Sequence, residues 1–252
     1  MKYKLLFLFM MAFSGQALAQ LQPLSYVDGT QQLKGLLARP VQPQSGKAGI
    51  LILPAWMGID QHSREVAEQL AGMGYYAFVA DIYGEGHYPK SPQEAGERSS
   101  YYKKHVGEYQ KRIRLALAQL QQAGAKEVVV IGYCFGGAGA LEAARANLPV
   151  KGVVSFHGAY GRDPARKIEP IVPKVLILHG ADDPYSSAEE ISNLQKELRT
   201  AKADWQMVYY SGAVHAFTDR DAGNDNSKGV AYNQQADRRS WQAMLQFLKE
   251  LL

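Results

Sequence analysis

The residue best suited to nucleophilic chemistry is Cys134, the one cysteine among the 252 residues of the chain. It stands in the segment Gly132-Tyr133-Cys134-Phe135-Gly136-Gly137, after an apolar run and before an alanine-rich stretch. Glycines two positions before and two after a nucleophile let a strand, a sharp turn and a helix pass close together. At a helix N-terminus the dipole favours thiolate over thiol. The pattern predicts a nucleophilic thiol, with a packed and inert cysteine as the alternative.

Two later segments supply partners for such a nucleophile. Asp182 and Asp183 follow the apolar run that ends at Leu178, and His215 follows the run that ends at Tyr210. A carboxylate can hold a histidine in the tautomer that base catalysis needs. The order nucleophile, acid, histidine is the order of α/β-hydrolase triads. Either aspartate could be the acid, and the other would then form a turn or cap a helix.

Strands and helices alternate along the chain, which predicts a three-layer α/β fold with a mostly parallel central sheet. Continuous apolar runs indicate strands that are buried on both faces. We expect strands at residues 33–39, 49–54, 76–80, 127–131, 150–156, 172–178 and 205–210. We expect helices at residues 62–72, 100–122, 138–146, 187–199 and 236–252, and loops at 81–99 and 218–230. Ligands bind beyond the carboxyl ends of such strands, so the turns there should carry the site.

Acyl transfer through a tetrahedral oxyanion also needs two backbone N–H donors. One is expected at Phe135, directly after the thiol. The other is expected at Trp56, in the turn that follows the strand at 49–54. The Trp56 side chain could also simply roof the pocket.

Residues that could contact a substrate stand at or just beyond the ends of predicted strands. They are Tyr83, Glu85, Tyr133 and His157. Histidines away from these ends are expected at the surface, namely His62, His87 and His105.

The N-terminus has the pattern of an export signal. Lys2 and Lys4 precede nine apolar residues at 5–13, and Ala17-Leu18-Ala19 forms a small-x-small cleavage site. The apolar run is too short for a membrane anchor, because a spanning helix needs ~20 residues. We expect cleavage after Ala19, a single domain over residues 20–252, and a periplasmic or secreted protein.

The composition excludes several classes of protein and of site. Without Lys2 and Lys4, 26 basic residues face 24 acidic ones, so there is no electrostatic case for binding nucleic acid. One cysteine excludes an intrachain disulfide and a multi-cysteine zinc site. The acidic residues between 219 and 225 lack the spacing of a calcium loop. We therefore expect a small-molecule substrate, no metal, no cofactor and no stable membrane anchor, and the oligomeric state is left open.

These segments together resemble the dienelactone hydrolase family of the α/β-hydrolase superfamily. The likeness runs from about Leu33 to Leu252 and rests on the turns at 132–137, 180–184 and 212–217. The cysteine is the specific part, because most α/β hydrolases have serine at this position. The resemblance implies hydrolysis of an ester or lactone through a thioester acyl-enzyme. It implies Cys134 as nucleophile, Asp183 as acid, His215 as base, and the N–H groups of Trp56 and Phe135 as oxyanion donors.

The chain departs from the family pattern around the substrate. Ala55 replaces a glutamate that helps to switch the family's cysteine between thiol and thiolate. The loop after the strand at 76–80 has Glu85 instead of a substrate-binding arginine, and residues 216–219 contain none. We therefore expect Cys134 to rest as thiolate more often than in relatives, and the substrate to be different and uncharged.

Other activities fit the same residues. A thioesterase, an acetyl esterase or a small peptidase could use this triad, because leaving-group preference depends on the shape of the loops. A binding protein that kept the fold is a further alternative, although a binder does not need three reacting groups. A redox-sensing thiol in the cell envelope is another.

Overall fold

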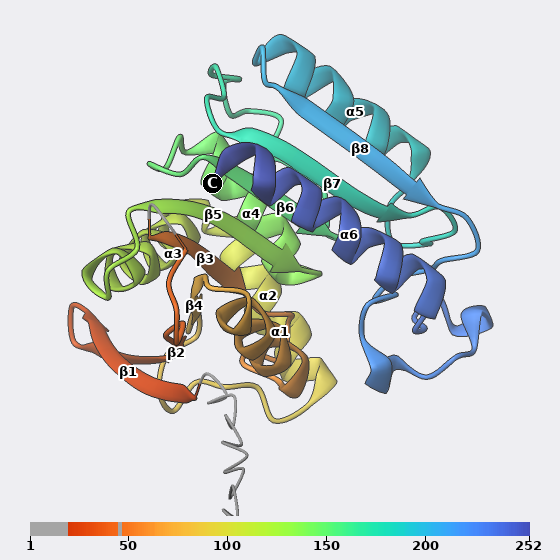
Figure 1. The fold of residues 1–252 in the computed structure, drawn as a ribbon. Helices are drawn as coiled ribbons and strands as arrows, with labels where there is room; N and C mark the ends of the chain where they lie inside the picture. Colours follow the sequence, from red (N-terminus) through yellow and green to blue (C-terminus); the bar gives the residue numbers. More distant parts are fainter. Residues whose placement is uncertain (1–19, 45–46) are drawn as a thin grey trace, which may run out of the picture.

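Eight strands form one sheet in the order β1-β2-β4-β3-β5-β6-β7-β8 (Figure 1). This computed structural model describes residues 20–44 and 47–252, so the predicted signal sequence at 1–19 lies outside the described residues. The strands are β1 (Leu21–Asp28), β2 (Gln31–Ala38), β3 (Ala48–Leu53), β4 (Tyr76–Val79), β5 (Glu127–Tyr133), β6 (Gly152–Phe156), β7 (Lys174–Gly180) and β8 (Trp205–Tyr210). The six strands from β4 to β8 in this order pair in parallel. Strand β2 is antiparallel to both of its neighbours, β1 and β4.

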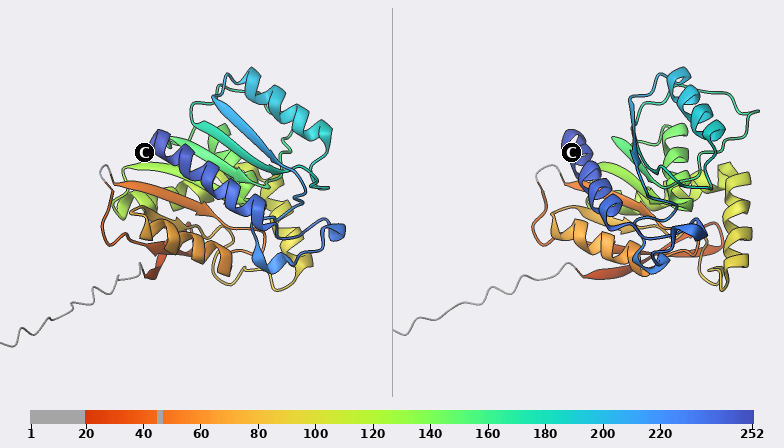
Figure 2. Two further views of the ribbon diagram at one scale, coloured as in Figure 1. Left: turned by 45° about the vertical axis from the view of Figure 1, so that its right-hand side comes forward. Right: turned by 90° about the vertical axis from the view of Figure 1, so that its right-hand side faces the viewer.

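Six α-helices of the described residues cover the two faces of the sheet (Figure 2). They are α1 (Gln61–Gly72), α2 (Pro92–Lys104), α3 (Val106–Gln122), α4 (Phe135–Arg145), α5 (Ala188–Thr200) and α6 (Gln234–Leu251). Helices α1 and α6 pack on one face with the buried cluster around Ile52 and Met244. Helices α2 to α5 pack on the other face, with the cluster around Leu53 and Ile113. The expected three-layer fold with a mostly parallel sheet is confirmed.

The central strands are buried because helices cover both of their faces. All six residues of β3 are buried, and so are all residues of β5 after Glu127. A strand in this position needs apolar side chains on both sides, which explains the continuous apolar runs. The stiff centre of the sheet places the ends of β3, β5, β6 and β7 next to one another, and the turns there carry the site.

The segments predicted as a loop at 81–99 and as one helix at 100–122 differ in the structure. The segment 81–99 is only partly a loop, because α2 begins at Pro92. Proline is tolerated in the first turn of a helix, and the Ser91 side chain accepts from the Glu94 N–H as an N-cap. The predicted helix at 100–122 is accordingly two helices, which meet at His105.

The edge strand β1 has no counterpart among the expected strands. It pairs with β2 over its whole length, from Leu21 opposite Ala38 to Asp28 opposite Gln31. It contains Pro23 and buries only Tyr26, so it lacks the apolar pattern of an inner strand. Proline is acceptable at an edge, where one side of the strand donates no ladder hydrogen bond.

Candidate active site

Cys134 lies at the tip of a sharp turn between β5 and α4. Its backbone has φ 52° and ψ −110°, a conformation that side chains rarely adopt and that costs about 1–3 kcal/mol. The flanking glycines make the turn possible. A Cβ on Gly132 would overlap the backbone of Gly136, and a Cβ on Gly136 would overlap the carbonyl group of Leu53. The strain therefore presents a half-buried thiol at the carboxyl edge of the sheet.

His215 and Asp183 meet at the same edge, although 32 positions separate them. Nδ1 of His215 lies 2.8 Å from Oδ2 of Asp183, whose side chain is fully buried. The other carboxylate oxygen accepts from the backbone N–H of Tyr185 at 2.9 Å. Asp182 is exposed and contacts the loop through its backbone N–H alone. Of the two aspartates that the sequence left open, the structure brings Asp183 to the histidine.

The surroundings of His215 favour its protonated form. Burial opposes the charge, but hydrogen bonds to Asp183 and to Cys134, with the negative charges of both, outweigh burial and raise the pKa of His215 to about 10. Since Asp183 occupies Nδ1, the opposite nitrogen Nε2 faces the thiol. The ring therefore bridges the carboxylate and the sulfur and can carry a proton between the sulfur and a bound molecule.

Two backbone N–H groups in the turns after β3 and β5 have no hydrogen-bond acceptor within the part of the chain that the structure describes. They belong to Trp56, in the turn after β3, and to Phe135, the first residue of α4. Tyr83 fixes the peptide that follows Trp56 by donating its hydroxyl to the Trp56 carbonyl at 2.7 Å. Tyr109 does the same for the peptide that follows Phe135, with its hydroxyl 2.9 Å from the Phe135 carbonyl. Each of these peptides adjoins the one that carries the free N–H.

The Phe135 ring lies between the two tyrosines that hold these peptides. Its centroid is 4.6 Å from that of Tyr109 and 5.7 Å from that of Tyr83, and the rings are nearly parallel. Tyr83 is buried and its hydroxyl is already bonded. It therefore supports the turn after β3 from within the core, and its contact with substrate stays a prediction.

The model of the dienelactone hydrolase family matches residues 33–252 of the chain. The chain belongs to this family. The expected resemblance is confirmed, and with it the assignment of the chain as a hydrolase on the α/β-hydrolase fold.

Members with solved structures superpose closely on this one. The protein m3DLH is 31% identical, with a TM-score of 0.88, and the match covers 94% of this chain and all of m3DLH. The dienelactone hydrolase-like promiscuous phosphotriesterase P91, from metagenomic libraries, is 32% identical with a TM-score of 0.86, over 93% and 99% of the two chains. A Saccharolobus solfataricus protein named "Putative carboxymethylenebutenolidase" is 24% identical over 89% of this chain and 96% of its own.

In this member of the dienelactone hydrolase family, His157, an expected substrate contact, lies buried inside the protein. Its side chain is buried, and its Nε2 lies 2.8 Å from the hydroxyl of Thr218. Its ring meets that of His215 edge to face, with centroids 5.3 Å apart. Burial and the nearby charge of His215 hold the pKa of His157 well below its ordinary value, so it is neutral.

The other two expected substrate contacts, Tyr133 and Glu85, have partners within the protein. The Tyr133 ring is buried and stacks on Phe156 in the core beneath α1 and α6, because alternate residues of a strand face opposite sides. Glu85 is exposed and forms an ion pair with Lys34 of β2 at 3.6 Å. His62, expected at the surface, is half-buried, with its ring edge-on to Tyr133.

One residue at the mouth of the site was not among those predicted from the sequence. Tyr185 is 59% exposed, and its ring centroid lies 5.2 Å from that of His215. It stands two residues after Asp183, in a turn of the kind that lines such sites, so its position was a usable signal. Trp56 and Met57, each 38% exposed, add apolar surface in the turn after β3.

Residues 20–44 and 47–252 hold neither a cluster of metal-ligating side chains nor a membrane-spanning helix. No three His, Cys, Asp or Glu side chains there group as metal ligands. None of the helices in that part of the chain combines the length and the apolar character needed to cross a bilayer.

Proposed function

We propose that this protein hydrolyses ester or lactone bonds with Cys134 as nucleophile, His215 as acid and base, and Asp183 as the residue that orients His215. One observation supports this most: the His215 ring connects the buried Asp183 carboxylate, at 2.8 Å, to the Cys134 thiol. Membership of the dienelactone hydrolase family supports the reaction class.

In the first half of the proposed reaction, the Cys134 thiolate attacks the carbonyl carbon and forms a carbon–sulfur bond. The carbonyl electron pair moves to oxygen, and the N–H groups of Trp56 and Phe135 stabilise that charge. When the tetrahedral species collapses, the bond to the alkoxide breaks and Nε2 of His215 gives it a proton. The products are an alcohol and a thioester. Removal of one oxyanion donor costs about 10²–10³-fold in rate in other hydrolases.

In the second half, neutral His215 takes a proton from water, and the resulting hydroxide attacks the thioester carbonyl. The carbon–sulfur bond then breaks, which releases a carboxylic acid and restores the thiolate and imidazolium. Asp183 keeps Nδ1 protonated in both halves, so that Nε2 is always the nitrogen that exchanges a proton.

Turnover of short p-nitrophenyl esters by the chain from Gln20 onward tests the proposal. We expect repeated turnover by the wild type and none by Cys134→Ala, with a thioester adduct on Cys134 in mass spectra of quenched reactions. Cys134→Ser is a matched control that keeps the shape of the turn. Equal turnover by wild type and Cys134→Ala contradicts the proposal, and inactivity of both directs attention to the binding or redox alternatives.

Phosphotriester cleavage is a second candidate activity, favoured by the 32% identity to P91 over nearly the whole chain. A thiolate in front of two oxyanion donors suits attack at phosphorus as well as at carbon. Hydrolysis of paraoxon by the wild type, lost in Cys134→Ala, is the expected result, and inertness towards paraoxon removes this candidate.

We also propose export of the chain and removal of residues 1–19. The support is the basic start, the nine apolar residues and the Ala-Leu-Ala site in the sequence. A mature N-terminus at Gln20 in a periplasmic or secreted fraction is the expected finding. An intact Met1 in the cytoplasmic fraction contradicts it.

A further inference from the structure

A cavity of about 590 Å³ lies against α4, close to the candidate active site. Its walls come from the end of α2 and the start of α3, from one stripe of α4, and from the segment 159–166 after β6. The α4 stripe begins at Ala138, whose N–H donates to the Cys134 carbonyl at 3.2 Å. The cavity therefore starts one helical turn from the nucleophile and extends away from it along the helix.

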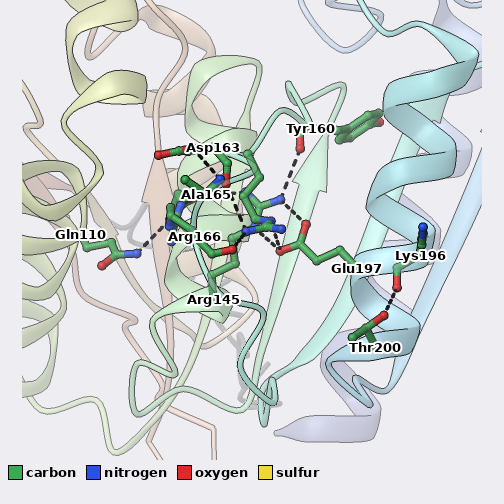
Figure 3. A network of polar contacts seen from close by, with 11 residues as sticks. Gln110, Arg145, Tyr160, Asp163, Ala165, Arg166, Lys196, Glu197 and Thr200 are labelled. Atoms are coloured by element: carbon green, nitrogen blue, oxygen red, sulfur yellow. Dashed lines mark hydrogen bonds and ion pairs between the residues drawn. The ribbon is translucent and has the colours of Figure 1, made fainter.

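A buried ion network forms part of the cavity wall, and Figure 3 shows its polar contacts. Arg145 bonds to Glu197 and to Glu142, each at 2.8 Å, and its side chain is only 6% exposed. Arg166 binds both oxygens of Glu142, at 2.9 and 3.0 Å. Arg162 approaches Glu197 at 3.5 Å. Three guanidinium groups thus face two carboxylates, so one positive charge is left in surplus.

Further positive charge stands at the rim of the cavity. Lys103 and Lys104 line it, are exposed, and form no ion pair with any residue that the structure describes. Asp163 and Glu190 also line the cavity and keep their negative charges, because they accept from the neutral N–H groups of Ala165 and Ser187. With the network included, five positive side chains stand against four negative ones, so one positive charge is left in surplus. The cavity is therefore suited to a negatively charged group.

The position of His215 indicates which part of a substrate enters the cavity. The leaving alcohol must lie beside His215 to receive its proton. The loop that carries His215, residues 211–232, contributes nothing to the cavity wall. The acyl part then extends away from His215, and the cavity wall nearest to Cys134 along α4 begins at Ala138.

Resting on the proposed function, we propose that this cavity binds the acyl part of the substrate, and that Lys103, Lys104 and Arg162 recognise a carboxylate at its far end. The helix rise sets the length of the spacer. Ala138 is about 6 Å along the helix from Cys134, and Glu142 is about 12 Å. The expected substrate is therefore a half-ester of a medium-length dicarboxylic acid. Residues 85 and 216–219 predicted an uncharged substrate, and this proposal replaces it with one that carries its charge at the end of the acyl part.

A purely structural role for the same residues makes a different prediction. Lys103 and Lys104 lie in the last turn of α2, where cations favour the helix dipole. The ion network also ties the segment 159–166 to α4. In that case removal of the lysines changes the reaction of charged and uncharged esters alike.

The test compares the mono-p-nitrophenyl esters of adipic and suberic acid with the same esters whose free acid is methylated. We expect wild type to prefer the charged member of each pair, less strongly in high salt. In Lys103→Gln/Lys104→Gln we expect kcat/KM to fall about tenfold, mainly through KM, for the charged esters only. The matched control is Lys196→Gln/Lys249→Gln, which removes two exposed lysines from other helices and leaves the preference intact.

Two results overturn the proposal: equal kcat/KM of wild type for charged and methylated esters, or an equal loss for both in the double variant. Turnover of the methylated esters tests the proposed function separately. Calorimetric binding of suberate keeps the cavity testable if no ester is hydrolysed. Wild type should bind suberate about tenfold more tightly than Lys103→Gln/Lys104→Gln, and equal binding rejects the site.

Discussion

His157 and His215 lie edge to face with ring centroids 5.3 Å apart, and one is neutral while the other is held protonated. His157 also bonds through Nε2 to Thr218, three residues after His215. The segment that carries His215 has no long strand of its own and pairs through a single bridge to Val230. The hydrogen bond from His157 to Thr218 therefore connects the segment that carries His215 to the end of β6.

Loss of the hydrogen bond between His157 and Thr218 should impair the proposed catalysis without unfolding the protein. Thr218→Val keeps the shape of the side chain and deletes the hydroxyl, and we expect kcat to fall about tenfold because His215 loses part of its alignment. Thr218→Ser restores the hydroxyl and should restore most of the rate. Measurement of kcat, KM and thermal midpoint for the pair separates alignment from stability. Equal kcat in Thr218→Val and wild type contradicts this role.

The raised pKa of His215 predicts where activity and stability decline at high pH. Its folded pKa of about 10 exceeds the ordinary 6.5. The group therefore stabilises the folded state fully below pH ~6.5, and this contribution is lost as the pH rises through about 10. The kcat/KM profile should likewise hold to about pH 10 and then fall, because the alcohol loses its proton donor.

Asp183→Asn should move that decline in activity to lower pH. The amide keeps the size of the side chain but removes the charge that favours imidazolium, and it can select the wrong tautomer. We expect kcat to fall about 10²–10⁴-fold. Asp182→Asn is the matched control, with activity near that of wild type. The same pH profile in Asp183→Asn and wild type shows that Asp183 does not act through His215.

Tyr83→Phe should weaken the proposed oxyanion site without disturbing the core. The ring stack on Phe135 remains, and the hydrogen bond to the Trp56 carbonyl is lost, a change of about 1 kcal/mol. We expect kcat to fall about fivefold and KM to change little, because the Trp56 N–H matters most in the transition state. A loss confined to KM places Tyr83 in substrate binding instead.

The buried ion network should matter for stability far more than an exposed pair. Arg145→Met leaves Glu142 and Glu197 without their central partner and is expected to cost about 3–5 kcal/mol in urea unfolding. Lys167→Met removes an ion pair with Glu169 in which both side chains are mostly exposed. That control should leave the free energy of unfolding nearly unchanged, because an exposed pair contributes little. Comparable losses in both variants contradict the assignment of the network as the stabilising element.

Local sequence signals were sufficient for most of the elements. The apolar runs of β3 and β5 and the helical spacing of α1 depend on burial by nearby layers, and each is visible within a few residues. The helix that begins at Pro92 was harder to predict from the sequence, because proline and glycine indicate a loop locally. Its helix forms because Ala95, Ser99 and Tyr102 are buried against the core, a contact with distant parts of the chain.

The sequence by itself determined the reactive turn of this protein. Glycines around Cys134, a strand before it and a helix after it are local features, and local sterics force the turn once they are present. The order of thiol, acid and histidine is likewise a property of the chain. Only the tertiary structure decided which aspartate meets His215, that His157 and Tyr133 are buried, and that a charged cavity lies along α4. Those distances depend on strand order and on which residues each layer covers, and neither is encoded in any short segment.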